Sequence, residues 1–177
     1  EPFRGGFVGV DVFFVISGYL ITTILIEDIE NKRFSIVNFY ERRAIRILPA
    51  LFFVMLVCIP FVWIWMLPTQ MKDFSASIFS ASVFLSNLYF MSQINYFAPY
   101  AELNPLLHTW SLSVEEQFYL FFPPLLLVLL KPGRRFAIFG IFLFAASSFI
   151  FSELAWRENP ERNFFFSLSR IWEIFAG

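Results

Sequence analysis

Four long apolar runs constrain the fold of this chain more than any other feature of its sequence. They occupy residues 7–26, 47–67, 107–130 and 136–152. A helix of about twenty residues rises about 1.5 Å per residue, so it crosses the roughly 30 Å hydrocarbon core of a bilayer. Hydrophobic residues make up 58% of the 177 residues and charged residues only 15%, which is far from the composition of a soluble domain. The sequence therefore predicts an all-α fold, a polytopic bundle of transmembrane helices.

A weaker apolar segment, residues 74–92, brings the expected number of membrane segments to about five. Serines and Asn87 interrupt it, so it forms either a buried span or a re-entrant segment, and its polar face should contact protein. The connector 27–46 carries five Lys and Arg residues, which favours the cytoplasmic side for the connector. The same charge bias favours the re-entrant alternative for residues 74–92.

The remaining segments are expected to connect or extend these spans. Residues 92–108 contain asparagines and prolines and are expected to form a loop. A charged link then runs from the end of the apolar run 136–152 to Asn163. A further helix is expected from Phe164 onward. Because the chain starts at Glu1 without a methionine and stops at Gly177 within an apolar run, we expect both ends to be cuts through a longer protein.

Composition excludes some classes of partner. The net charge of -1 is incompatible with the basic surface that a nucleic-acid-binding protein needs, so we expect the lipid bilayer and no nucleic acid as a partner. Cys58 is the only cysteine and lies in an apolar run, so it forms no internal disulfide. We predict no metal site and no bound cofactor.

An acidic pair stands at the head of the run 107–130. Each charged side chain in hydrocarbon costs about 2.5–3.5 kcal/mol even on the lenient insertion scale, so Glu115 and Glu116 indicate a functional site. On a helix His108, Glu115 and Tyr119 share one face with Ser111, and Glu116 lies on the neighbouring strip. A histidine beside a carboxylate acts as a base or a proton relay. The alternatives are that the glutamates pair with arginines of other helices and that His108 is an interfacial residue.

An arginine cluster precedes the second apolar run. Arg42, Arg43 and Arg46 share a helix face at spacings of three and four residues. Guanidinium groups bind phosphate oxygens in a bidentate manner, so this face could hold a nucleotide pyrophosphate or a lipid phosphate. The alternative is a membrane anchor whose side chains extend to the lipid headgroups.

A third group of polar residues lies inside apolar segments. Asp11 follows Arg4, Gly5 and Gly6 at the start of the first span, and a buried aspartate there needs a cation. Ser17 and Gly18 predict tight helix packing more than chemistry. Near the end of the chain, Arg170 and Glu173 are spaced to form an intrahelical salt bridge or to join a polar centre.

Four segments together resemble the acyltransferase 3 family of integral membrane acyltransferases. They are RGGFVGVDVFFVISGYLIT, FYERRAIRILPAL, LLHTWSLSVEEQFYLFFP and SRIWEIFAG, in this order. The resemblance covers essentially the whole chain, which would then be part of a single membrane acyltransferase domain, residues 1–177. It implies a bundle of about ten membrane helices in the intact protein.

The resemblance also implies an activity and its participants. The family transfers an acyl group, commonly acetyl from acetyl-CoA, to a hydroxyl of an extracytoplasmic glycan such as lipopolysaccharide O-antigen or peptidoglycan. Acyl-CoA and the glycan would be the partners, in a bacterial inner membrane. By the motif match, Arg43 and Arg46 of the arginine cluster would hold the donor's phosphates, and Glu115 and Glu116 would belong to the polar centre. His108 and Tyr119 would have supporting roles.

One departure from the family pattern concerns the catalytic base. The family's histidine lies in a helix that precedes the RGGFVGVD motif, so we expect it upstream of Glu1 and expect the fragment alone to be inactive. The alternative function is a transporter or lipid or glycan flippase, in which Glu115, Glu116 and Asp11 form a proton or cation relay.

Overall fold

The structure is a computed structural model that describes residues 8–101 and 104–177, without the side chains of residues 95–101. Eight helices occur in these residues: α1 (Val8–Glu30), α2 (Ile36–Trp65), α3 (Pro68–Ser82), α4 (Ser86–Ala101), α5 (Thr109–Leu130), α6 (Arg134–Glu158), α7 (Pro160–Phe165) and α8 (Ser167–Ala176). The described part of the chain contains no strand, so the predicted all-α fold is confirmed.

Four of these helices are long and apolar enough to cross a membrane, namely α1, α2, α5 and α6. They cover most of the four apolar runs of the sequence, although α2 ends at Trp65 and α5 begins at Thr109. The helices are longer than predicted at several ends. In particular, α2 begins at Ile36, well before the run 47–67, so Pro49 and Pro60 both lie inside the helix. The reason is that the connector before the run is itself helical except for a short turn.

That turn between α1 and α2 ends the first helix without a glycine. The Lys32 N–H donates to the carbonyl of Ile29 at 3.0 Å, and the Arg33 N–H donates to that of Asp28 at 2.8 Å. This pair of bonds is a Schellman motif, and Lys32 takes its left-handed position with φ 55°. A lysine there carries a backbone strain that glycine would avoid.

The segment 74–92 is not one helix, which argues against the first of its two alternatives, a single buried span. Helix α3 ends at Ser82, α4 begins at Ser86, and Phe84 between them has φ 55° in a second Schellman motif. The expected loop at residues 92–108 is wrong in its first part, because α4 continues to Ala101. A re-entrant path for this segment stays a prediction.

The charged link before Asn163 is also partly helical, because it contains the start of α7. The Asn159 side chain accepts from the Arg162 N–H at 3.1 Å and so caps the first turn of α7. The last helix, α8, begins at Ser167, slightly later than the predicted Phe164. The described residues divide into two compact units, Glu1–Ile36 with Val114–Gly177 (unit 1) and Val37–Ser113 (unit 2).

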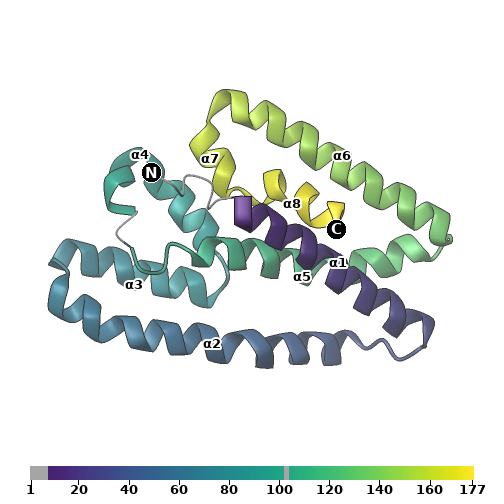
Figure 1. Ribbon diagram of the computed structural model, residues 1–177, viewed down its shortest axis with the longest axis horizontal. Helices are drawn as coiled ribbons and strands as arrows, with labels where there is room; N and C mark the ends of the chain where they lie inside the picture. The colour runs from purple at the N-terminus through teal and green to yellow at the C-terminus, as the bar shows by residue number, and fades with distance from the viewer. Residues whose placement is uncertain (1–7, 102–103) are drawn as a thin grey trace. The chain divides into compact units, whose positions relative to one another are not determined.

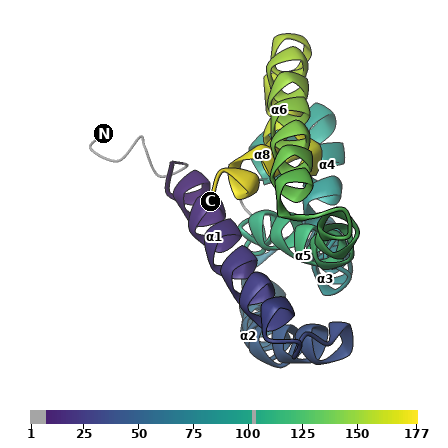
Figure 2. The same cartoon turned by 90° about the vertical axis from the view of Figure 1, so that its right-hand side faces the viewer.

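In unit 1, α8 lies between α1 and α6, as Figures 1 and 2 show from two directions. Gly18 permits the contact with α1, because a Cβ at this position would overlap the carbonyl oxygen of Ile174. Gly177 similarly lies against the backbone of Val15. Small residues that let two backbones approach are typical of helix contacts in membranes. The predicted packing role of Gly18 is confirmed.

In unit 2, the polar face of α3 and α4 is buried, as predicted. Ser77 and Ser86 are 0% exposed. Ser77 Oγ donates to the Asn104 side chain at 3.3 Å, and the hydroxyls of Ser86 and Ser113 lie 2.7 Å apart. The apolar core of this unit joins side chains of α2 and α3 to the turn before α5, namely Leu51, Met55, Val62, Phe74, Ala81 and Leu106.

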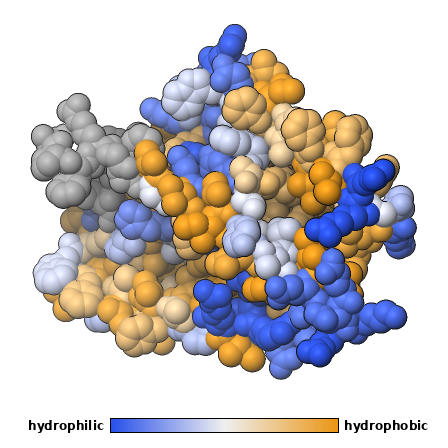
Figure 3. Space-filling model, turned by 45° about the vertical axis from the view of Figure 1, so that its right-hand side comes forward, coloured by the Kyte–Doolittle hydropathy of each residue, from blue (hydrophilic) through white to orange (hydrophobic). Residues whose placement is uncertain are grey.

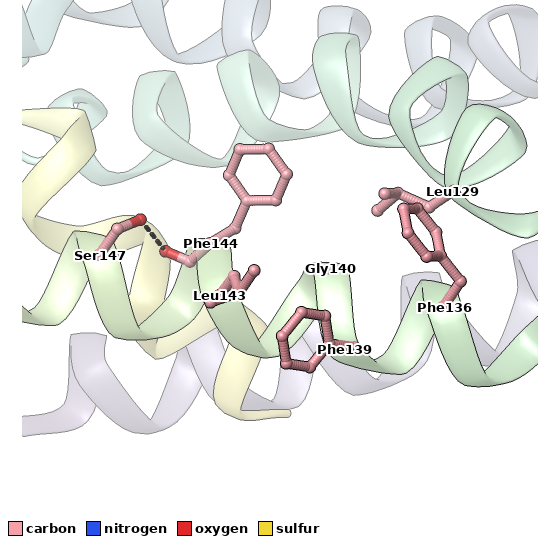
Figure 4. A pocket seen from close by; sticks show the side chains of 7 residues that line it. All are labelled: Leu129, Phe136, Phe139, Gly140, Leu143, Phe144 and Ser147. Carbon is pink, nitrogen blue, oxygen red and sulfur yellow. Dashed lines mark hydrogen bonds between the residues drawn. The ribbon is translucent and has the colours of Figure 1, made fainter.

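Large hydrophobic side chains are exposed along the spanning helices, among them Val12 of α1, Phe53 of α2 and Phe142 of α6. On the face shown in Figure 3, hydrophobic residues cover broad areas beside separate groups of hydrophilic residues. Such surfaces suit contact with lipid or with further membrane helices. Figure 4 shows one groove of this kind, of about 560 Å³, where Leu129 lies against Gly140 and the other lining side chains are apolar apart from Ser147.

Candidate functional site

A buried hydroxyl and carboxylate cluster connects α1 to α5. The Tyr119 hydroxyl donates to Glu115 Oε1 at 3.1 Å, one helical turn earlier. It is also hydrogen-bonded to the Ser17 hydroxyl of α1. Ser17, Glu115 and Tyr119 are 7%, 4% and 5% exposed. The structure therefore brings two of the predicted residues, Glu115 and Tyr119, into one polar cluster.

A second cluster lies at the contact of α1 with α8. Arg170 Nη1 lies 3.0 Å from Asp11 Oδ1 and 2.6 Å from Glu173 Oε1. The arginine side chain is 15% exposed and that of Glu173 is 6% exposed. Asp11 thus has the cation that its position required. The salt bridge of Arg170 is not only intrahelical, because the same nitrogen bridges two helices.

The Arg170 side chain is fixed from a further direction. Its Nε donates to the carbonyl of Phe164 at 3.3 Å, and its guanidinium carbon lies 4.7 Å from the centre of the Phe164 ring. A cation over an aromatic face is held electrostatically, and a planar guanidinium that donates in several directions loses its rotational freedom. Arg170 is therefore a fixed link between its two carboxyl partners.

Two serines that were not predicted from the sequence hold α8 in place. Ser148 of α6 donates to the carbonyl of Leu168 at 2.5 Å and accepts from the N–H of Trp172 at 3.0 Å. Ser167 donates to Gln117 Oε1 of α5 at 2.5 Å. A serine in an apolar helix is a weak signal in a sequence, because most such hydroxyls bond to their own helix.

The other predicted residues of the acidic segment are placed differently. His108 is exposed and lies in the turn before α5, which begins at Thr109. It is therefore not part of the helical face that carries Glu115 and Tyr119, and its carbonyl accepts from the Ser111 hydroxyl at 3.2 Å. Glu116 is half-buried beside Glu115.

The arginine cluster belongs to unit 2 and lies near the start of α2. Arg42 and Arg46 are exposed, and Arg43 is half-buried with its guanidinium carbon 5.9 Å from the centre of the Phe39 ring. Their helix extends without a break from this polar end into the apolar run. The three guanidinium groups are thus carried by a regular helix at the spacing that the sequence predicted.

Some residues of the predicted motifs lie outside the described parts. These are Arg4, Gly5 and Gly6 of the first motif. Within the described part of the chain, no group of three His, Cys, Asp or Glu side chains is arranged to hold a metal ion. The polar atoms of both clusters in unit 1 are suited to proton transfer and hydrogen bonding.

Comparison with known proteins places the chain in a family. The family described as "acyltransferase domain" (acyltransferase 3) matches residues 2–177. The chain belongs to this acyltransferase family. The assignment agrees with the resemblance of the four sequence motifs, and the two polar clusters of unit 1 lie within three of those motifs.

Relatives of this acyltransferase-family chain include named transferases. It is 45% identical over 131 residues to an O-acetyltransferase OatA of Staphylococcus aureus, a match that covers 71% of this chain and 21% of the relative. It is 40% identical over 130 residues to the peptidoglycan O-acetyltransferase OatA of Listeria monocytogenes, covering 72% and 21%. It is 37% identical over 176 residues to a putative membrane-bound transacylase BcsY of Komagataeibacter xylinus, covering 98% and 44%.

The acyltransferase-family chain therefore spans less than half the length of each of these relatives. No solved structure matches it. Its four helices of spanning length, together with the family match and the relative named as a membrane-bound transacylase, make it an integral membrane protein.

Proposed function

We propose that this chain is part of a membrane O-acetyltransferase that esterifies a hydroxyl group of a cell-envelope glycan. The observation that carries the proposal is the family match over residues 2–177, because it includes every polar cluster described above. The names of the OatA relatives support acetyl as the transferred group and peptidoglycan as the first acceptor to test. The relatives are bacterial, which supports a bacterial inner membrane as the location.

The reaction requires a proton acceptor and a stabilised oxyanion. The glycan hydroxyl loses its proton to a base, its oxygen attacks the acyl carbonyl, and the carbonyl oxygen becomes negatively charged before the leaving group departs. The family resemblance assigns the base to a histidine before Glu1, and this stays a prediction. A buried carboxylate such as Glu115 can orient an imidazole and stabilise its protonated form.

Tyr119 and Ser17 fix the orientation of the Glu115 carboxylate. The Tyr119 hydroxyl occupies one carboxylate oxygen at 3.1 Å and is itself bonded to Ser17. Glu115 is thereby held in one orientation in an apolar helix, where a carboxylate without hydrogen bonds would be costly. We therefore assign Glu115 the role of positioning the base, with Tyr119 as the residue that holds it.

We further propose acyl-CoA as the donor. Its nucleotide end carries phosphates, and Arg42, Arg43 and Arg46 present three guanidinium groups near the start of α2. Two of these side chains are exposed, which makes them accessible to a ligand. The bidentate geometry of arginine suits a pyrophosphate better than the point charge of a lysine would.

A labelled-donor experiment tests the proposal. The full-length protein is reconstituted in liposomes and given acetyl-CoA with a labelled acetyl group and soluble peptidoglycan fragments. The expected result is alkali-labile label on the glycan and one free CoA thiol for each ester formed. Glycan that crosses the bilayer without gaining label would overturn transferase activity in favour of transport. Acetylation that proceeds only from another donor would overturn the acyl-CoA assignment.

A further inference from the structure

The cluster formed by Asp11, Arg170 and Glu173 contains more negative than positive charge. Two carboxyl groups meet one guanidinium nitrogen, at 3.0 Å and 2.6 Å. Because both groups contact the same nitrogen, the Asp11 and Glu173 carboxyl groups lie near each other. If both were ionised, the cluster would hold one negative charge in excess at the contact of α1 with α8, where the Glu173 side chain is 6% and the Asp11 side chain 37% exposed.

Two carboxyl groups that share one cation favour a state with one proton. Two carboxylates at one site resist ionising together, because the second charge is repelled by the first. Ionised carboxylates carry acceptors only, whereas a single proton lets one group donate to the other. Charge balance thus favours one proton on the pair formed by Asp11 and Glu173.

The other charged groups described on the neighbouring helices have contacts of their own or are exposed. On α6, Glu153 and Arg157 are exposed and pair with each other at 3.0 Å, and on α7 the side chains of Glu161 and Arg162 are exposed. On α5, the Glu115 carboxylate accepts from Tyr119, and Glu116 is half-buried. The described charge contact of the Arg170–Glu173 pair is with Asp11 of α1.

The free oxygen of Glu173 limits what can neutralise the cluster. Its Oε2 atom is buried and has no hydrogen-bond partner among the described residues, and the side chain is only 6% exposed. An ionised oxygen in this position carries a desolvation cost that falls sharply when the group is neutral. The atom is closed to bulky ligands, whereas a proton needs almost no space.

We propose that Asp11 and Glu173 share one proton, which makes the Asp11–Arg170–Glu173 triad an electrically neutral proton-binding site. The site goes beyond the proposed acyl transfer, because it depends on the triad and not on the group that is transferred. The bond to this proton lies between α1 and α8, so the site also links the packing of these helices to proton occupancy.

Infrared spectroscopy of the full-length protein in lipid nanodiscs tests the proposal. A protonated carboxyl group has a carbonyl stretch that is separate from the carboxylate bands and shifts in heavy water. At neutral pH the wild type should show such a band. Both Asp11→Asn and Glu173→Gln should abolish it, because each variant leaves one carboxylate to pair with Arg170. The control Glu153→Gln, at an exposed ion pair of α6, should keep the band.

Several results would overturn the shared proton. One is a wild-type spectrum that lacks the band at neutral pH. Another is a band that survives in either single variant. A melting temperature gives the second measurement: each single variant keeps the triad neutral and should melt close to the wild type. The double variant leaves Arg170 without a carboxylate and should melt clearly lower. Single variants that unfold as readily as the double variant would contradict the proposal.

Discussion

Arg170 Nη1 of α8 lies 3.0 Å from Asp11 Oδ1 of α1, although 159 residues separate them in the sequence. This contact fastens the last described helix to the first. It is supported by Gly18, whose lack of a side chain lets the backbone of α8 approach α1. The positions of Glu173 and of the α8 backbone therefore depend on α1.

Replacing Arg170 with Met should destabilise the protein. The substitution keeps the length of the side chain but leaves Asp11 and Glu173 without their cation, and breaking a buried ion pair costs about 3–5 kcal/mol. We expect the lower end of that range, because the carboxyl pair can take up a second proton. The matched control is Arg157→Met, which breaks an exposed pair with Glu153 and should cost about 0.5 kcal/mol. Equal melting temperatures for the two variants would refute the role of Arg170.

Gly18→Ala should separate α1 from α8. The new Cβ would overlap the carbonyl oxygen of Ile174, and a backbone atom cannot move aside without shifting its helix. We expect a large drop in melting temperature in detergent. Gly9→Ala, on the same helix and with open space around the new Cβ, should be neutral or slightly stabilising. A Gly18 variant that melts like the Gly9 variant would show that the close contact is not needed.

Lys32→Gly should stabilise the turn after α1. Lys32 has φ 55°, and a side chain in the left-handed region costs about 1 kcal/mol or more that glycine avoids. Part of this gain is lost to the greater freedom of glycine in the unfolded chain, so we expect up to about 1 kcal/mol. Lys131→Gly is the control, in the turn between α5 and α6. This lysine has no positive φ, so the substitution should not stabilise the protein. The melting temperatures of the two variants test this expectation, and a Lys32 variant that melts no higher than the Lys131 variant would contradict it.

Tyr119→Phe should affect both stability and transfer. It removes the hydroxyl that joins Ser17 to Glu115 and leaves the buried carboxylate without that donor. Losing a hydrogen bond to a charged group costs about 2 kcal/mol. If Glu115 positions the catalytic base, the rate of acetyl transfer should fall as well. Tyr19→Phe, at a 59% exposed tyrosine of α1, is the control and should change neither quantity.

Much of the fold follows from the sequence because the membrane restricts it so strongly. Apolar runs of spanning length become helices, since no other structure satisfies the backbone in hydrocarbon. The need of Asp11 for a cation followed from the same reasoning. Its partner could not be named, because several arginines were available and only the packing of α8 on α1 selects Arg170.

The errors of the sequence analysis share a physical origin. The break at Phe84 and the end of α1 at Lys32 use left-handed residues without the glycine that usually signals them. Residues 92–101 look like a loop because of Asn95 and Pro99, yet α4 includes them. His108 has the right spacing for the face of Glu115, but the helix begins one residue after it. Local composition does not fix where a helix starts.

The most direct test measures ester-linked acetate on the envelope glycan of cells that make the full-length protein. Mass spectrometry compares the wild type with Glu115→Ala and Arg46→Ala at equal protein abundance, with Arg33→Ala, an exposed arginine between α1 and α2, as the control. We expect both site variants to lose most of the acetate and the control to keep it. If both site variants acetylate the glycan as well as the wild type does, the assignment of this site is contradicted.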